Sequence, residues 1–238
     1  GIKDVADSPH SFISDNAVMN SLVFRSAFEH SVSNTILLSC TVMYQSSGTP
    51  LKESDFDANE EMYPSYFGGA WNKVYFEKMC EFYSRLGRGK YTAMRHSNVY
   101  GPHDKFDLEK SHVFGATISK VMKNKTGSIE IWGDGTQTRS FLYVTDFVDG
   151  ILTAAEHAPN SDPINIGTHE EVTIGELAQH VINTVNPKLR LEFDTTKPRG
   201  QPRRAGNLDR ADAIGFSAQV SLPDGLQRTF DWYRRTIE

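Results

Sequence analysis

The apolar residues of this chain follow two spacings, one helical and one extended. Between residues 12 and 30 they recur every three or four positions, which indicates an amphipathic helix, and residues 35–38 form a short apolar run typical of a buried strand. The pattern predicts further helices at 70–86, 111–123, 145–157, from 173, and at 222–237, and strands at 91–96, 129–132, 141–144, 163–166 and 189–193. This alternation favours a layered α/β fold with a mainly parallel sheet.

Cap and turn residues mark several boundaries. Thr145 is predicted to cap a helix, with Asp146 in its first turn to suit the helix dipole. Thr173 and Glu176 have the spacing of a capping box, and Gly133-Asp134-Gly135 predicts a turn. Two stretches rich in polar residues and turn formers are expected to be irregular: 45–63 and 195–207.

The composition is that of an ordinary soluble domain, with 38% hydrophobic and 23% charged residues among 238. No apolar run approaches the about 20 residues of a membrane span, and no leader pattern is visible, so we expect a cytoplasmic protein without a membrane partner. The net charge of −5 argues against a nucleic-acid partner. Cys40 and Cys80 are too few for a disulfide framework or a metal cluster.

Five motifs stand in a fixed order along the chain: 37–44 (LLSCTVMY), 71–73 (WNK), 98–104 (NVYGPHD), 132–141 (WGDGTQTRSF, followed by VTD at 144–146) and 165–167 (NIG). Together they resemble the extended short-chain dehydrogenase/reductase family, the NAD(P)-dependent epimerases and dehydratases of nucleotide sugars. Within it the likeness is greatest to GDP-L-fucose synthase and GDP-mannose epimerases, and the segment 98–113 is most like the former.

The resemblance implies a Rossmann-type parallel sheet and a small α/β substrate lobe. We expect residues 1–100 to belong to the Rossmann part and 101–238 mainly to the lobe, with 141–158 returning to the first part. The family normally opens with a Gly-rich turn that holds the cofactor pyrophosphate. No such turn is found near Gly1-Ile2, so an incomplete sheet lacking its N-terminal strands is expected. The missing part is either cut from the chain or supplied by a partner.

The family's catalytic residues are only partly matched. Lys73 matches the Lys that lowers the pKa of a Tyr base and holds the nicotinamide ribose of NAD or NADP. Gly69 stands at the Tyr position, four residues earlier, and Tyr63 and Tyr66 are set aside because Gly68-Gly69 argues against so early a helix start. Cys40 stands at the family's usual Ser/Thr position. Its neighbours Ser39 and Thr41 each offer a hydroxyl that could take that role.

In fucose synthases a Cys and a His perform the epimerisation. Val42 stands at the Cys position, whereas His112 matches the His and is a candidate to titrate or to bind substrate. The resemblance further implies a set of substrate-binding residues, three of them arginines suited to a diphosphate: Asn98, His112, Lys120, Trp132, Arg139, Arg203 and Arg204. The cofactor-binding candidates are Lys73, Ser39 and Cys40, and no metal site is expected.

Three hypotheses remain open. The chain is a piece of an epimerase or reductase, a non-catalytic module that binds a nucleotide-diphosphate sugar, or half of a split enzyme with a substitute base such as Thr41, Cys40 or His112. Gly69 favours the second, and we expect the chain alone to be inactive and not to bind the dinucleotide. By resemblance we also expect a homodimer that pairs the helices at 12–30 and 70–86.

Overall fold

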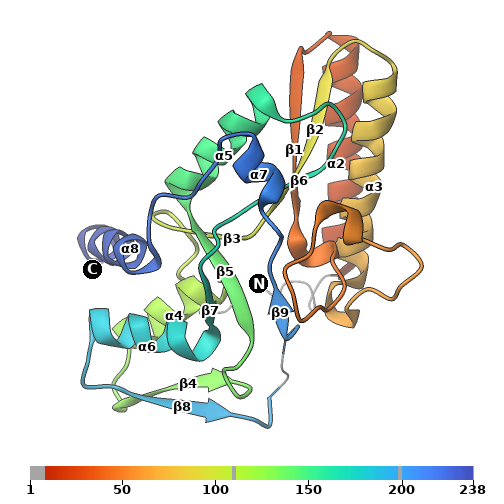
Figure 1. Cartoon of the computed structure of the whole chain (residues 1–238). Coiled ribbons are helices and arrows are strands. Elements are labelled where there is room, and N and C mark those ends of the chain that lie inside the picture. The colour runs from red at the N-terminus through yellow and green to blue at the C-terminus, as the bar shows by residue number, and fades with distance from the viewer. Residues whose placement is uncertain (1–8, 109–110, 198–199, 238) are drawn as a thin grey trace.

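The computed structural model of the chain describes residues 9–108, 111–197 and 200–237 (Figure 1). The helices are α2 (Pro9–Glu29), α3 (Phe67–Arg85), α4 (Val113–Met122), α5 (Val144–His157), α6 (Ile174–Val185), α7 (Asp209–Ala213) and α8 (Leu222–Thr236). The strands are β1 (Asn34–Cys40), β2 (Lys90–His96), β3 (Asn98–Tyr100), β4 (Ser128–Trp132), β5 (Thr138–Tyr143), β6 (Ile164–Ile166), β7 (Glu171–Thr173), β8 (Arg190–Asp194) and β9 (Arg203–Arg204). None of these helices is long and apolar enough to cross a bilayer.

A parallel three-stranded sheet in the order β1-β2-β6 organises one part of the molecule. The strands β1 and β2 pair along their whole length, from Asn34 opposite Lys90 to Cys40 opposite His96. Parallel strands need long crossover connections, which α3 provides between β1 and β2. The carboxyl ends of β1 and β2 therefore lie side by side, and the polar residues that follow them are brought together.

The two faces of this sheet are covered by different helices. Leu37 and Ala93 pack with residues of α2 and α3, whereas the neighbouring Ile36 and Met94 pack with residues of α5. This follows from the two-residue period of a strand, which sends successive side chains to opposite faces. In Figure 1, α2 and α3 run side by side along β1 and β2.

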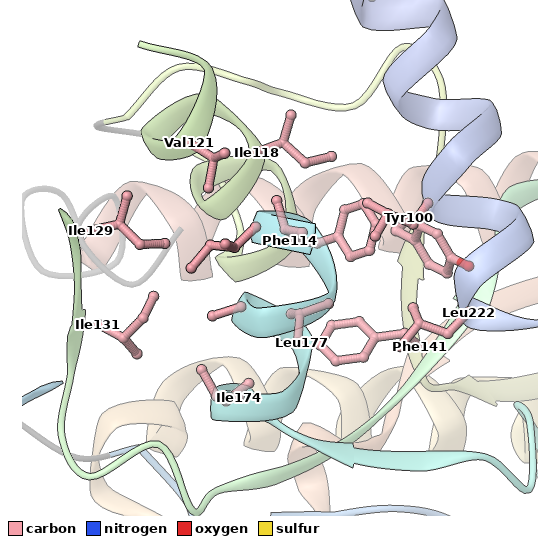
Figure 2. Packing of buried hydrophobic residues seen from close by; sticks show 14 of the residues in the cluster. Tyr100, Phe114, Ile118, Val121, Ile129, Ile131, Phe141, Ile174, Leu177 and Leu222 are labelled. Atoms are coloured by element: carbon pink, nitrogen blue, oxygen red, sulfur yellow. The ribbon is translucent and has the colours of Figure 1, made fainter. Parts of the chain in front are cut away.

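The largest apolar cluster lies among α4, α6, α8 and the strands β3 to β5. Figure 2 shows the rings of Tyr100, Phe114 and Phe141 gathered at its centre, and the Tyr100 and Phe114 ring centroids are 4.2 Å apart. Around this cluster β5 pairs with β3, β7 and β9, while β4 and β8 form a separate parallel pair (Figure 1). Pairing of β5 with β9 brings the arginine-containing segments 138–139 and 203–204 into register.

The structure confirms the α/β class with a parallel sheet, and the elements predicted at 12–30, 35–38 and 91–96 are present. The capping box also forms, because the Thr173 hydroxyl accepts from the Glu176 amide and the Glu176 carboxylate accepts from the Thr173 amide. Of the helices and strands named above, four short ones were not predicted: β3, β7, β9 and α7. The division of the chain at residue 100 stays a prediction.

The predicted cap of α5 was wrong. The helix begins at Val144 with Tyr143 as its N-cap, two residues earlier than the predicted Thr145 cap. Asp146 does lie in the first turn, but its carboxylate is buried and accepts the backbone N–H groups of Gln219 and Val220 at 3.0 and 2.9 Å. Its role is therefore to hold a distant loop as well as to suit the helix dipole.

Candidate functional site

Three of the predicted catalytic and cofactor-binding residues lie at the carboxyl end of β1. Cys40 is the last residue of β1 and is half-buried, and Thr41 follows in a buried 3-10 turn (Thr41–Met43). Lys73 of α3 reaches the same place, because its ammonium donates to the Leu38 carbonyl at 2.6 Å. The structure thus brings Lys73, Cys40 and Thr41 to one end of the sheet, and their catalytic and cofactor roles stay predictions.

Ser39 has a partner that the sequence did not reveal. Its hydroxyl donates to the Glu77 carboxylate of α3 at 2.6 Å. Glu77 also receives the guanidinium of Arg95, at 2.7 Å from the terminal nitrogen and 3.0 Å from Nε. Arg95 is 4% exposed and Glu77 11%, so this is a buried, charge-assisted pair. Ser39 is held by it and is less suited to a cofactor than Lys73.

The start of α3 differs from the prediction. The helix begins at Phe67, so that Gly68 and Gly69 lie in its first turn, and a 3-10 turn over Pro64–Tyr66 leads into it. A Cβ atom on Gly68 would collide with the Ile13 side chain of α2, so glycine permits the close approach of the two helices. The helix therefore begins three residues before the predicted position 70 and includes both glycines, although Tyr63 and Tyr66 stay outside it, as the glycine argument expected. Packing against α2 outweighs the poor helix propensity of the glycines.

The early start places Tyr66 close to the arginines. It is the N-cap of α3 and stands seven residues before Lys73, which is nearly two full turns and hence a similar side of the helix. The Arg204 guanidinium lies over its ring, with 5.6 Å from Cζ to the ring centroid, a cation–π distance. The sequence analysis considered Tyr66 as a substitute for the family's Tyr but set it aside. Its signal was the seven-residue spacing from Lys73.

Arg139 and Arg204 form a basic cluster with Asn98. Arg139 on β5 is 7% exposed, and its guanidinium donates to the Thr138 carbonyl at 2.7 Å. Arg204 lies opposite it on β9 and donates to the side-chain oxygen of Asn98. The Asn98 amide nitrogen in turn donates to the Ser140 carbonyl at 3.1 Å. Within the described ranges, neither arginine forms an ion pair with a carboxylate.

The two positive charges of this cluster affect each other. The pKa of Arg139 is lowered to about 10, first by burial and then by the charge of Arg204, while Tyr66 and Tyr63 act in the opposite direction. Arg139 is still a cation at neutral pH. The Nε atom of Arg204 is buried without a hydrogen-bond partner. Arg139 is thus a buried cation with a second cation beside it and no partner among the described carboxylates, an arrangement that favours an anion between the two arginines.

Three other predicted substrate residues lie away from this cluster or are already engaged. Arg203 is paired with Glu171, at 2.8 Å from Nε, and donates to the Gly48 carbonyl. Lys120 donates to the main chain of β4 at Glu130, 2.8 Å away, and burial lowers its pKa. Trp132, at the end of β4, is 51% exposed, with the Lys197 ammonium 5.9 Å from its ring centroid.

His112 is the N-cap residue of α4. Much of its surface is open to solvent, yet the protein atoms around the imidazole desolvate it enough to lower its pKa. The positive charges of Arg204 and Lys105 lower the pKa as well, and Asp104 raises it. The influence of Arg204 on this pKa is the only described link between His112 and the arginine cluster. Across the described ranges, no three His, Cys, Asp or Glu side chains gather as metal ligands.

The sequence profile of the NAD dependent epimerase/dehydratase family matches residues 1–167. GDP-L-fucose synthase of Sinorhizobium fredii is 33% identical over 227 residues, which cover 94% of this chain and 72% of the relative. GDP-L-fucose synthase of Escherichia coli is 31% identical over 238 residues, covering 94% and 74%. The chain therefore belongs to the NAD dependent epimerase/dehydratase family, and the resemblance inferred from its motifs is confirmed.

Solved structures show the same fold. A GDP-6-OMe-4-keto-L-xylo-heptose reductase from C. jejuni superimposes with a TM-score of 0.91 at 22% identity, covering 99% of this chain and 79% of that one. A GDP-L-fucose synthetase from Naegleria fowleri bound to NADP gives a TM-score of 0.88 at 22% identity, covering 95% and 74%. The parallel sheet of this chain is thus of the Rossmann type found in nucleotide-sugar epimerases and reductases.

Proposed function

We propose that this chain binds a nucleotide-diphosphate sugar, with a GDP-sugar favoured, and that Arg139, Arg204 and Asn98 hold its diphosphate. The observation that carries the proposal is Arg139, a buried guanidinium for which no described carboxylate serves as ion-pair partner. A buried cation is costly unless it is paired, and a second cation, Arg204, lies beside it. Guanidinium groups match phosphate oxygens in a bidentate way, and a diphosphate supplies one phosphate for each.

The preference for GDP rests on the relatives. Several of the curated proteins similar to this chain are named GDP-L-fucose synthases, and the similar solved structures include reductases of GDP-linked heptoses. The half-exposed Trp132 and the lysine above its ring provide an aromatic surface for a base at the end of β4. His112, whose pKa Arg204 helps to lower, is a candidate contact for the sugar.

Calorimetry on the full chain tests the proposal. We expect GDP-mannose and GDP to bind with micromolar affinity, about −8 kcal/mol, UDP-glucose to bind more weakly, and free mannose not to bind. Raising the salt concentration is expected to weaken binding, since the contacts are largely ionic. If neither GDP nor any nucleotide-diphosphate sugar binds, the proposal is wrong. Equal binding of GDP-mannose and UDP-glucose would remove the preference for GDP.

A nicotinamide dinucleotide fits only part of the described site. The Lys73 ammonium has three N–H donors, one of which bonds the Leu38 carbonyl. The other two suit the hydroxyl groups of a nicotinamide ribose at the end of β1. Such a cofactor supplies hydride chemistry in this family. The described residues contain no Gly-rich turn between a strand and a helix that would hold its pyrophosphate, so they do not form a complete dinucleotide site.

We infer that binding, rather than turnover, is the activity of this chain. Gly69 stands on the helix of Lys73 at the position where the family has its Tyr base, and it offers no proton. Cys40 stands at the usual Ser/Thr position. NADPH fluorescence, followed with and without a GDP-linked 4-keto sugar, is expected to show neither quenching nor consumption. Consumption of NADPH by the unchanged chain would overturn this inference and favour a substitute base.

We also propose a homodimer through α2 and α3. Outward-facing apolar side chains line both helices, all of them more than 40% exposed: Val18, Met19, Leu22, Val23, Tyr75, Phe82 and Leu86. An apolar surface of this extent usually marks an interface. Leu22→Glu is expected to convert the dimer to a monomer in light scattering, since it places a charge among these residues. Gln179→Glu, an equal charge on α6, is the control, and a monomeric unchanged chain would contradict the proposal.

A further inference from the structure

The Tyr44 hydroxyl lies at the centre of a buried hydrogen-bond network. Tyr44 is 2% exposed and follows the 3-10 turn after β1. Its hydroxyl donates to the Asn165 side-chain oxygen at 2.8 Å and accepts from the Arg95 guanidinium at 2.9 Å. Burial raises the pKa of Tyr44 to about 12, so the proton stays on the phenol and the direction of both hydrogen bonds is fixed.

On one side the network reaches the helix of Lys73. Arg95 joins the Tyr44 hydroxyl to Glu77, with which it is paired through two nitrogens. Glu77 stands four residues after Lys73 on α3, hence on the same face of the helix. The end of β2 and the middle of α3 are therefore tied to Tyr44 by charge-assisted hydrogen bonds.

On the other side the network holds the segment that carries Arg204. The Tyr44 carbonyl accepts from the Gln201 side-chain amide at 3.2 Å, and Gln201 is fully buried. The Asn165 amide donates to the carbonyls of Leu51 and Asn207, each at 3.0 Å. The chain is thus fixed three residues before and three residues after Arg204.

Residues 201–207 lie closely against Tyr44 and Asn165. A Cβ atom on Gly206 would stand 2.8 Å from Asn165 Cγ, so only glycine allows the segment to lie against Asn165. Tyr44, Gln201 and Arg204 also line one small pocket at the surface. The Gln201 side-chain oxygen is buried without a hydrogen-bond partner, and among the described residues it is the Tyr44 carbonyl that holds the Gln201 side chain.

We propose that Tyr44 is a positioning residue for Arg204, because it anchors Gln201 and Asn165 and so fixes residues 201–207 where the Arg204 guanidinium stands beside Arg139. This inference rests on the proposed function, in which the two arginines hold a diphosphate. Tyr44 touches neither arginine of the cluster with its hydroxyl and acts through the segment between its two anchors. A positioned cation binds more tightly than a mobile one, since less side-chain and loop ordering is lost on binding.

The test is a double-mutant cycle on GDP-mannose binding, measured by calorimetry on the full chain. Tyr44→Phe removes only the hydroxyl and is expected to weaken binding about tenfold. Arg204→Met is expected to weaken GDP-mannose binding as well. In the Arg204→Met background, Tyr44→Phe is expected to weaken binding less than about twofold further, because the two changes act on one interaction. Tyr91→Phe is the matched control: its hydroxyl is buried without a partner beside α2 and α3, and no change in binding is expected.

The outcomes are distinct. If the unchanged chain binds no nucleotide, the proposed function fails, whatever Tyr44 does. If the unchanged chain binds and Tyr44→Phe binds equally well, or if its effect adds fully to that of Arg204→Met, the positioning role is overturned and Tyr44 is a packing residue only. Should Tyr44→Phe fail to fold, Gln201→Leu removes the other anchor and enters the same cycle, with the same coupling to Arg204 expected.

Discussion

Arg139→Met is expected to weaken the binding of GDP-mannose about 100-fold and, at the same time, to leave the fold as stable or more stable. Loss of one partner from a buried charge pair costs about 2–5 kcal/mol of binding, and 100-fold is near 2.7 kcal/mol. In the ligand-free protein, however, Arg139 is 7% exposed and has no described carboxylate partner, so it destabilises the fold. Calorimetry and thermal unfolding measure the two effects.

The opposite signs of these effects separate a binding residue from a structural one. We expect the melting temperature to rise by ~2–4 °C if removal of the cation stabilises the chain by about 1 kcal/mol. Arg190→Met is the matched control, since Arg190 is exposed at the far end of β8 from Trp132 and no change in binding is expected. A marked fall in melting temperature, with binding unchanged, would show that Arg139 belongs to the core and not to an anion site.

Much of the fold could be predicted because its signals are local. The capping box at Thr173 and the strand–helix alternation depend on neighbouring residues, and both are present. The start of α3 could not be predicted, since the residue that makes Gly68 necessary is Ile13, on another helix. The two-residue strand β9 has no periodicity of its own and exists through its pairing with β5.

Only part of the candidate site could be predicted, because motifs are local whereas tertiary contacts are not visible in the sequence. Asn98, Arg139 and Arg204 were identified from motifs, and the structure brings them together. The sequence did not distinguish Arg204 from its neighbour Arg203, because the choice depends on Glu171, which engages Arg203 from a separate strand. Residues that act through tertiary contacts, such as the Glu77–Arg95 pair, have no sequence spacing to reveal them. In the sequence Arg95 is one of several polar residues of β2, and Glu77 is one of several charged residues of α3, so neither stands out.

The Glu77–Arg95 pair is expected to be essential for stability. Arg95→Met leaves the Glu77 carboxylate buried with the Ser39 hydroxyl as its remaining partner, and breaking a buried pair in this way costs about 3–5 kcal/mol. Urea unfolding is expected to show this loss, with a fall in melting temperature of ~10 °C. Burial lowers the pKa of Arg95, but the hydrogen bonds that Arg95 donates to the Glu77 carboxylate raise this pKa above its ordinary value, so Arg95 stays charged.

The double variant Glu77→Met/Arg95→Met distinguishes a buried pair from a loss of packing. Replacing both charges removes the uncompensated carboxylate, so most of the lost stability is expected to return. The pair Glu81–Arg85, exposed on the same helix, is the control, and Arg85→Met is expected to cost less than about 1 kcal/mol. If Arg95→Met costs no more than Arg85→Met, the pair is solvated, and the network from α3 through Tyr44 to Arg204 loses its rigid end.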